Sequence, residues 1–266
     1  MNPILYPFDP EAGTQSTDPD APLPALDFSS LGEPLRRIKA AGFDGVELLV
    51  TASLLKRPAA ELAAVLERCG LSAPAIAARW SFPHTAFDWR ATDAGFHYVD
   101  HFAPGLGAKL LTLRLSRPAK LAEDELKKSL TGALIQAANH CDPVGITAAV
   151  EFFDGGPLGS YSEAMDWLYF HAPQAGLAVD ASSLEAGSED TYRAITELGA
   201  AVKLVYLNLP NSFDYHRLFS ALKTMNSPAP IVLRGAGNDI DLSDAVSSLR
   251  QMFAEAPVQA VAVTES

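Results

Sequence analysis

The sequence is poor in cysteine and in long apolar runs, and each shortage excludes a class of protein. Two cysteines among 266 residues are too few for a disulfide framework. Both Cys69 and Cys141 end helical patterns, where we expect small buried side chains. No apolar run approaches the roughly 20 residues that span a bilayer. The first residues also lack the basic start and apolar stretch of a signal peptide, so we expect a cytoplasmic location without a membrane partner.

Positive charge is also in short supply. The chain has 20 Lys and Arg against 32 Asp and Glu, which gives a formal net charge of −12. Proteins that bind nucleic acid need clustered cations to neutralise phosphates, so nucleic acid is not an expected partner. The hydrophobic content of 48% and the charged content of 20% are those of an ordinary globular protein.

What the sequence does contain is a regular alternation of short apolar runs with amphipathic helical patterns. This alternation predicts an α/β fold, a (β/α)₈ TIM barrel that forms a single domain over residues 1–266. The predicted strands are residues 3–8, 45–50, 73–80, 109–115, 145–152, 176–180, 202–209 and 230–233. The predicted helices are residues 33–42, 58–69, 92–103, 123–140, 164–171, 191–198, 214–225 and 243–254. Ser160 and Glu163 form a capping box, and Ser243 is expected to cap the last helix.

Two segments remain outside this pattern. Residues 11–24 are acidic and contain proline, and they follow the first strand as either a lid or a solvated loop. Residues 258–263 are apolar and β-prone, and they either pack on the barrel exterior or pair in a homo-oligomer.

Barrel enzymes place their chemistry at the carboxyl ends of the strands, where the following loops converge on one face. The strand ends here carry a mixed ring of polar side chains: Asp9, Glu47, Arg79, Trp80, His84, Arg114, Arg117, Glu151, Asp180, Tyr206, Asn208 and Arg234. Glu151 and Asp180 end buried strands that are neighbours in the predicted barrel. A buried carboxylate needs a metal, a cationic side chain or hydrogen bonds as its partner, and the sequence leaves all three open.

Several stretches of the sequence resemble successive elements of one superfamily of barrels. They are IKAAGFDGVELL, GITAAVEFF, GLAVDASSL, VKLVYLNL and FDYHRLFSALKTMNSPAPIVLRG. They are similar to the xylose isomerase-like TIM barrels, which include sugar and sugar-phosphate isomerases and epimerases. The resemblance implies a small sugar-like substrate or ligand.

The resemblance also implies a metal site, of which this sequence keeps half. Metal-dependent members bind Mn²⁺, Mg²⁺, Co²⁺ or Zn²⁺ through Glu, Asp, His and Glu at the ends of strands five to eight. Glu151 and Asp180 match the first two ligands. The His position falls on Tyr206, with Asn208 as the nearest alternative, and the last Glu position falls on Arg234.

A guanidinium is permanently positive and cannot bind a cation, so Arg234 cannot act as a metal ligand at this position. We hypothesise that Arg234 takes the position of the metal and pairs with Glu151, Asp180 or both. No cofactor is then expected. If a divalent metal does bind, Glu151 and Asp180 are its ligands, with Glu265 at the end of the last apolar run as an alternative third.

Two functions remain open at this point. The first is an isomerase or epimerase type of enzyme, or a lyase, that abstracts a proton next to a carbonyl of a small polyol, ketose or sugar acid. Glu151, Asp180 and Arg234 are its predicted catalytic residues. The predicted substrate-binding residues are Trp80, His84, Arg114, Arg117, Tyr206 and Asn208. The second function is a degenerate barrel that binds a sugar-like or anionic ligand as a sensor or an inactive partner subunit.

Overall fold

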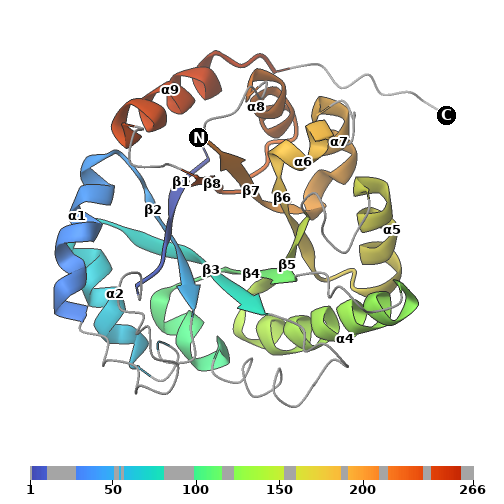
Figure 1. Cartoon of the computed structure of the whole chain (residues 1–266), viewed down its shortest axis with the longest axis horizontal. Coiled ribbons are helices and arrows are strands. Elements are labelled where there is room, and N and C mark those ends of the chain that lie inside the picture. The colour runs from blue at the N-terminus through green and yellow to red at the C-terminus, as the bar shows by residue number, and fades with distance from the viewer. Residues whose placement is uncertain are drawn as a thin grey trace.

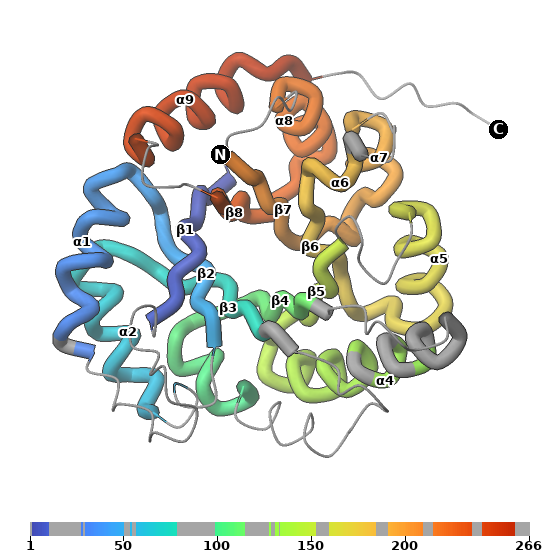
Figure 2. The backbone as a smooth tube through the Cα atoms, viewed as in Figure 1, coloured from blue at the N-terminus to red at the C-terminus, as the bar shows by residue number. Residues whose placement is uncertain are grey.

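In the computed structural model, eight parallel strands form a closed barrel with helices around its outside (Figure 1). The structure describes residues 2–10, 28–50, 54, 57–80, 99–115, 123–152, 160–186, 191–209, 215–235 and 241–258. The strand order around the barrel follows the sequence, and β8 closes against β1, as the trace in Figure 2 shows. The predicted TIM barrel is therefore confirmed.

The observed strands lie within one or two residues of the predicted ones. They are β1 (Ile4–Phe8), β2 (Gly45–Val50), β3 (Ser72–Trp80), β4 (Leu110–Leu115), β5 (Thr147–Phe152), β6 (Gly176–Asp180), β7 (Val202–Asn208) and β8 (Ile231–Arg234). Parallel strands that are buried on both faces appear in the sequence as continuous apolar runs, so the ends of these runs predict the ends of the strands.

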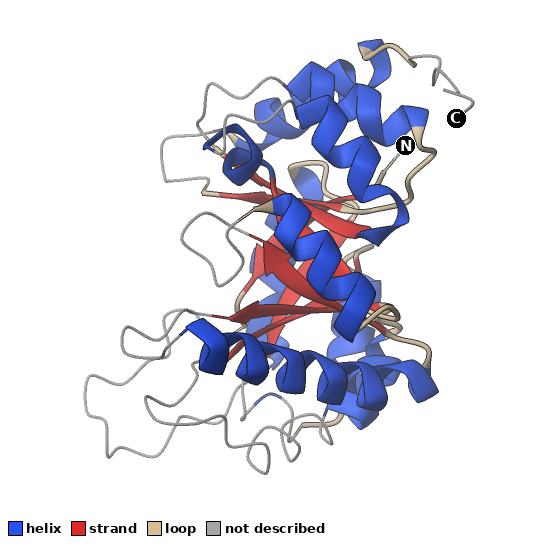
Figure 3. Cartoon of the chain, turned by 90° about the vertical axis from the view of Figure 1, so that its right-hand side faces the viewer, coloured by secondary structure: helices blue, strands red, loops and turns tan. Residues whose placement is uncertain are grey.

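The helices occupy the predicted intervals between the strands. They are α1 (Gly32–Ala40), α2 (Ala59–Arg68), α4 (Glu123–Cys141), α5 (Tyr161–His171), α6 (Ala181–Ala186), α7 (Thr191–Leu198), α8 (Tyr215–Thr224) and α9 (Leu242–Glu255), with short 3₁₀ turns at Phe28–Leu31, Asp142–Val144 and Gly199–Ala201. Residues 99–106 are also helical. The short helix α6 directly after β6 was not predicted. Seen from the side, the strands form the central layer between the helices (Figure 3).

One of the two predicted helix caps is correct. The Ser160 hydroxyl accepts a hydrogen bond from the Glu163 amide at 3.1 Å, as the capping box requires. The prediction for α9 was wrong, because Asp241 and not Ser243 is its N-cap. The Asp241 carboxylate accepts from the amides of Ser243 and Asp244, and an acidic cap also suits the positive end of the helix dipole.

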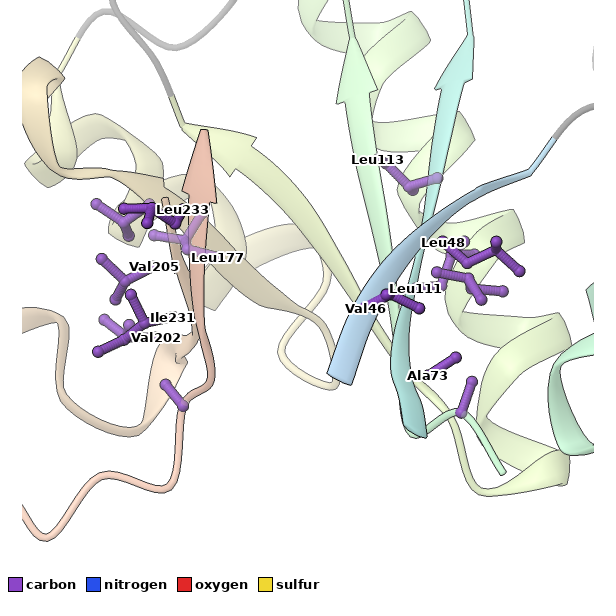
Figure 4. Packing of buried hydrophobic residues seen from close by; sticks show 14 of the residues in the cluster. Val46, Leu48, Ala73, Leu111, Leu113, Leu177, Val202, Val205, Ile231 and Leu233 are labelled. Atoms are coloured by element: carbon purple, nitrogen blue, oxygen red, sulfur yellow. The ribbon is translucent and has the colours of Figure 1, made fainter. Parts of the chain in front are cut away.

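Outward-pointing side chains of the strands form the main core against the helices. Figure 4 shows part of this core on opposite sides of the barrel. Its labelled members are Val46, Leu48, Ala73, Leu111, Leu113, Leu177, Val202, Val205, Ile231 and Leu233, and all are at most 3% exposed. Because successive side chains of a strand point to opposite faces, the residues between them point into the barrel interior.

The inward-pointing residues fall into two layers. The layer nearer the amino ends of the strands is apolar, and we call it the apolar layer: Leu5, Ala75, Leu110, Ala149, Ala178, Leu204 and Val232. The layer above it, nearer the carboxyl ends, we call the ionic layer: Glu47, Thr112, Glu151, Tyr206 and Arg234.

A glycine fixes the end of β8. Gly235 follows Arg234 with φ +76, and a Cβ at this position would lie 2.7 Å from the backbone oxygen of Leu209. Only glycine tolerates both the left-handed backbone and this approach. The turn therefore begins directly after Arg234, which stays at the last position of its strand.

Several predictions lie outside the described residues. These are the segment 11–24, the first part of the helix predicted over 92–103 and, apart from residue 258, the segment 258–263. Within the described helices, none combines the length and the hydrophobicity needed to cross a bilayer.

Candidate active site

The centre of the candidate site is an ion pair between Arg234 and Glu151. Arg234 Nη1 donates to Glu151 Oε1 at 2.6 Å, and Arg234 Nη2 donates to Glu151 Oε2 at 3.2 Å. Arg114 Nη1 donates to the same Glu151 Oε1 at 2.9 Å. The Glu151 side chain is 1% exposed, that of Arg234 is 13% exposed and that of Arg114 is 38% exposed. Two guanidinium groups thus neutralise one fully buried carboxylate through charge-assisted hydrogen bonds.

Arg234 is held from below by the ring of Tyr206. The guanidinium carbon of Arg234 lies 3.2 Å from the ring centroid, which is a close cation–π stack. Tyr206 is completely buried, and its hydroxyl donates to Glu47 Oε1 at 2.5 Å. Arg234 Nη2 also lies 3.9 Å from Glu47 Oε2, so the guanidinium sits between two carboxylates.

Glu47, on β2, is the second carboxylate of the ionic layer. The Thr112 hydroxyl donates to the same Glu47 Oε1 at 2.8 Å. Glu47 is 3% exposed, and its two described hydrogen-bond partners are neutral hydroxyls. Burial raises the pKa of Glu47, while the charge of Arg234 and the two hydrogen bonds oppose this shift.

The pKa values of the other two groups follow from the same contacts. Burial and the nearby Glu47 charge raise the pKa of Tyr206 well above its usual range, so its hydroxyl keeps the proton that it donates. Burial lowers the pKa of Arg234, but the hydrogen bonds to Glu151 together with the charges of Tyr206, Glu151 and Glu47 outweigh it, and the net direction is upward. Arg234 therefore remains a fixed positive charge.

A second, neutral set of contacts surrounds Asp180. The Asn208 amide nitrogen donates to both carboxylate oxygens at 2.9 Å. The Ser182 amide and hydroxyl donate to Asp180 Oδ1 at 3.0 and 2.6 Å. Asp180 is 8% exposed, and its Oδ2 accepts only from Asn208 within the described part of the chain.

Of the two pairings expected for Arg234, the structure contains the one with Glu151. Its second carboxylate neighbour is Glu47 and not Asp180. The strand register explains the difference, because Glu151 is paired with Ala178 across β5 and β6, whereas Asp180 lies two residues farther toward the carboxyl end of β6. Asp180 consequently belongs to the mouth of the barrel, where Asn208 at the end of β7 reaches it.

Some of the remaining predicted site residues lie in the site, and others lie outside the described part of the chain. Arg114 and Asn208 lie with Glu151 and Asp180 respectively, as described above. Tyr206 lies beneath Arg234 and is closed off from the mouth. The side chain of Trp80 and the residues His84, Arg117 and Glu265 lie outside what the structure describes.

Two members of the ionic layer and one contact of Asp180 were not among the predicted site residues. Glu47 appears in the ring of polar strand residues, but its place inside the run GVELLV gave no sign of a partner. Thr112 lies in the middle of β4 and Ser182 in the unpredicted helix α6. A carboxylate inside an apolar strand was the one available signal, since such a group is buried only with partners.

The donors present do not fit the divalent metal that the resemblance implies. Both oxygens of Glu151 are engaged by arginine, and the remaining ligand positions hold Tyr206 or Asn208 and Arg234. No group of three or more His, Cys, Asp or Glu side chains that could hold a metal occurs among the described residues. A bound cation would also face the permanent charge of Arg234.

Two comparisons of the sequence with known proteins find no match. No family model matches this sequence. A search of curated proteins likewise finds no match.

Solved structures, in contrast, match over almost the whole chain. A 3-keto-D-glucoside 4-epimerase from E. coli has a TM-score of 0.72 at 16% identity, covering 93% of this chain and 99% of that one. A D-allulose 3-epimerase from Methylomonas sp. has a TM-score of 0.71 at 16% identity, covering 95% and 91%. A xylose isomerase-like TIM barrel protein from Mycobacterium smegmatis, solved in complex with magnesium, has a TM-score of 0.69 at 15% identity, covering 96% and 97%. The chain therefore has the fold of the xylose isomerase-like sugar epimerases and isomerases, and the resemblance expected from the sequence is confirmed as a structural one.

Proposed function

We propose that this barrel binds a small polyol, ketose or sugar acid at its mouth and moves a proton next to a carbonyl without a divalent metal. The observation that carries this proposal is the bidentate pair of Arg234 with Glu151. A guanidinium stands at the strand-eight position where the resemblance puts the last metal ligand, and it supplies a fixed positive charge in a buried setting.

Arg234 is the group with the electrostatic role in this proposal. An enediolate oxygen that develops during proton abstraction needs a nearby positive charge or hydrogen-bond donor. The Arg234 Nε is buried and has no hydrogen-bond partner among the described residues. A donor in this state favours a site in which an oxygen of a ligand or of water completes the contact.

Asp180 is the better candidate for the proton acceptor than Glu151. An ionised carboxylate has about four acceptor positions. Glu151 uses three of them on arginine and is almost fully buried, whereas Asp180 Oδ2 accepts one hydrogen bond and is near the mouth. A single base suits isomerisation or dehydration better than epimerisation between two opposed bases.

A second candidate function is ligand binding without turnover. The saturation of Glu151 by two arginines favours it, because this carboxylate cannot accept a proton from a substrate without losing an ion pair. The protein would then hold a sugar-like or anionic ligand as a sensor or as an inactive partner subunit.

The experiment that separates these functions is solvent deuterium exchange measured by NMR on chelator-treated protein. A panel of ketoses and sugar acids is incubated in D₂O, and exchange at the carbon next to the carbonyl reports proton abstraction directly. The proposal predicts exchange that persists with chelator and falls at least roughly a hundredfold in Asp180→Asn, the range of one general acid or base. Exchange that requires added Mn²⁺ would contradict it. Thermal stabilisation by a ligand without exchange would support the binding function instead.

A further inference from the structure

A large pocket lined by described residues lies at the amino ends of the strands, opposite the candidate active site. It has a volume of about 600 Å³. We call it the floor pocket, and its lining is Pro3, Pro74, Lys109, Leu110, Thr147, Gly199, Ala200, Val202, Lys203, Met225, Asn226, Ser227, Pro228, Ala229 and Pro230. The lining residues come from the starts of several strands and from the turn before β8, so the pocket lies across the amino-terminal end of the barrel.

The wall between α8 and β8 is fixed by hydrogen bonds. The buried Asn2 side chain donates to the backbone oxygens of Ser227 at 3.0 Å and Ala229 at 2.6 Å. Asn226 has φ 49, a left-handed conformation that asparagine tolerates better than most residues. This side of the pocket is therefore preformed, which lowers the entropic cost of binding a ligand.

The charge of the floor pocket is opposite to that of the whole molecule. The protein has a formal net charge of −12, yet the pocket lining includes Lys109 and Lys203 and no Asp or Glu. Neither ammonium group has an ion pair or a hydrogen bond within the described ranges of the chain. The pocket is thus a place where an anion meets positive charge without a competing carboxylate.

Gly176 leaves room for the side chain of Lys203. The stem of this lysine lies against Gly176 at the start of β6, where a Cβ would collide with Lys203 Cγ. A lysine can cover apolar surface with its aliphatic stem while its charge remains in contact with water. Leu110, Met225 and the prolines of the lining provide an apolar surface beside this charge.

We infer that the floor pocket binds an amphipathic anion, with its apolar body on the proline-rich lining and its anionic group at Lys109 and Lys203. A medium-chain carboxylate has this chemistry. The site is separate from the mouth of the barrel, and the inference does not rest on the proposed function.

The probe for the test is 8-anilinonaphthalene-1-sulfonate, an aromatic anion that fluoresces in apolar pockets, with octanoate as its competitor. The variant pair is Lys109→Gln with Lys203→Gln, and the matched pair Lys109→Arg with Lys203→Arg keeps the charge. Lys128→Gln, an exposed position near the start of α4, is the control for overall charge.

We expect the glutamine pair to bind the probe at least roughly tenfold more weakly, and the arginine pair and Lys128→Gln to bind it as the wild type does. Ala200→Trp, which fills the pocket without a change of charge, should weaken binding to a similar extent. Octanoate should displace the probe, and octanol should not. Probe binding that is unchanged in the glutamine pair and in Ala200→Trp would overturn the inference, as would the absence of any saturable binding to the wild type.

Discussion

On β4, β5, β7 and β8 a member of the apolar layer and a member of the ionic layer lie two residues apart, and yet the two layers differ completely in chemistry. The apolar layer is built from Leu, Ala and Val side chains, most of them completely buried. The ionic layer places Glu47, Glu151 and Arg234 at almost the same depth. Burial of ion pairs rarely stabilises a fold more than apolar packing of the same volume, so stability alone does not explain the upper layer.

The position of the ionic layer in the barrel explains better why these charged residues are buried there. It lies toward the carboxyl ends of the strands, where barrels of this type bind and convert their substrates. Arg234 and its partners therefore lie where barrels of this type carry their chemistry, and the apolar layer packs the interior beneath them. The following variants test this division, starting with the largest expected effect.

Arg234→Met should be the most destabilising change in the interior. It leaves Glu47 without its cation and Glu151 with Arg114 alone, and breaking a buried pair in this way costs about 3 to 5 kcal/mol. Urea denaturation measures the loss. The control is Arg114→Met, which is partly exposed and should cost about 1 kcal/mol or less. The double variant Arg234→Met with Glu151→Met should recover part of the loss, and strictly additive costs would contradict a pair that acts as a unit.

Leu5→Ala should destabilise the apolar layer by packing alone. Leu5 is completely buried, and large-to-small changes of this kind cost about 2 to 5 kcal/mol through lost burial and the cavity left behind. Unlike the loss in Arg234→Met, this loss should not depend on salt concentration or pH. A marked salt dependence would show that the two layers are not energetically distinct.

The fold could be predicted from the sequence more fully than the site. The runs GVELLV and GLAVD gave the limits of β2 and β6 without error, because strands covered on both faces are largely apolar. The same uniformity hid which residues point inward. The partners of Glu47 could not be predicted, since Tyr206 lies 159 residues away and reaches it only because the barrel closes.

Tyr206→Phe should have a smaller effect, confined to one hydrogen bond within the ionic layer. It removes the hydroxyl that donates to Glu47 and keeps the ring beneath Arg234. A hydrogen bond to a charged group contributes about 1.5 to 3 kcal/mol, and Thr112 remains as a donor, so we expect about 1.5 kcal/mol by urea denaturation. Tyr169→Phe, on the exposed face of α5, is the matched control and should be neutral. Equal effects at both positions would refute a buried role for this hydroxyl.

Glu47→Gln should change the pH dependence of stability more than its magnitude. The raised pKa of Glu47 means that the folded chain holds this proton more tightly than the unfolded chain. The group therefore stabilises the fold below its ordinary value of 4.5, and this contribution is lost as the pH rises through the folded pKa. The melting temperature of Glu47→Gln relative to wild type should accordingly increase as the pH rises from 4.5.

Glu33→Gln gives a control of opposite sign. Hydrogen bonds from Arg36 and Arg37 lower the pKa of Glu33, so its contribution is present above 4.5 and lost as the pH falls. The melting temperature of this variant relative to wild type should increase as the pH falls. The same trend in both variants would contradict the assignment for Glu47.

The central claim is that Arg234 supplies the charge that a divalent metal would otherwise provide. Calorimetric titration of Mn²⁺ into chelator-treated wild type and into Arg234→Glu tests it most directly. We expect no saturable binding to the wild type and a measurable site in the variant, where a third carboxylate joins Glu151 and Glu47. Mn²⁺ binding to the wild type that is abolished by Glu151→Gln would contradict the claim.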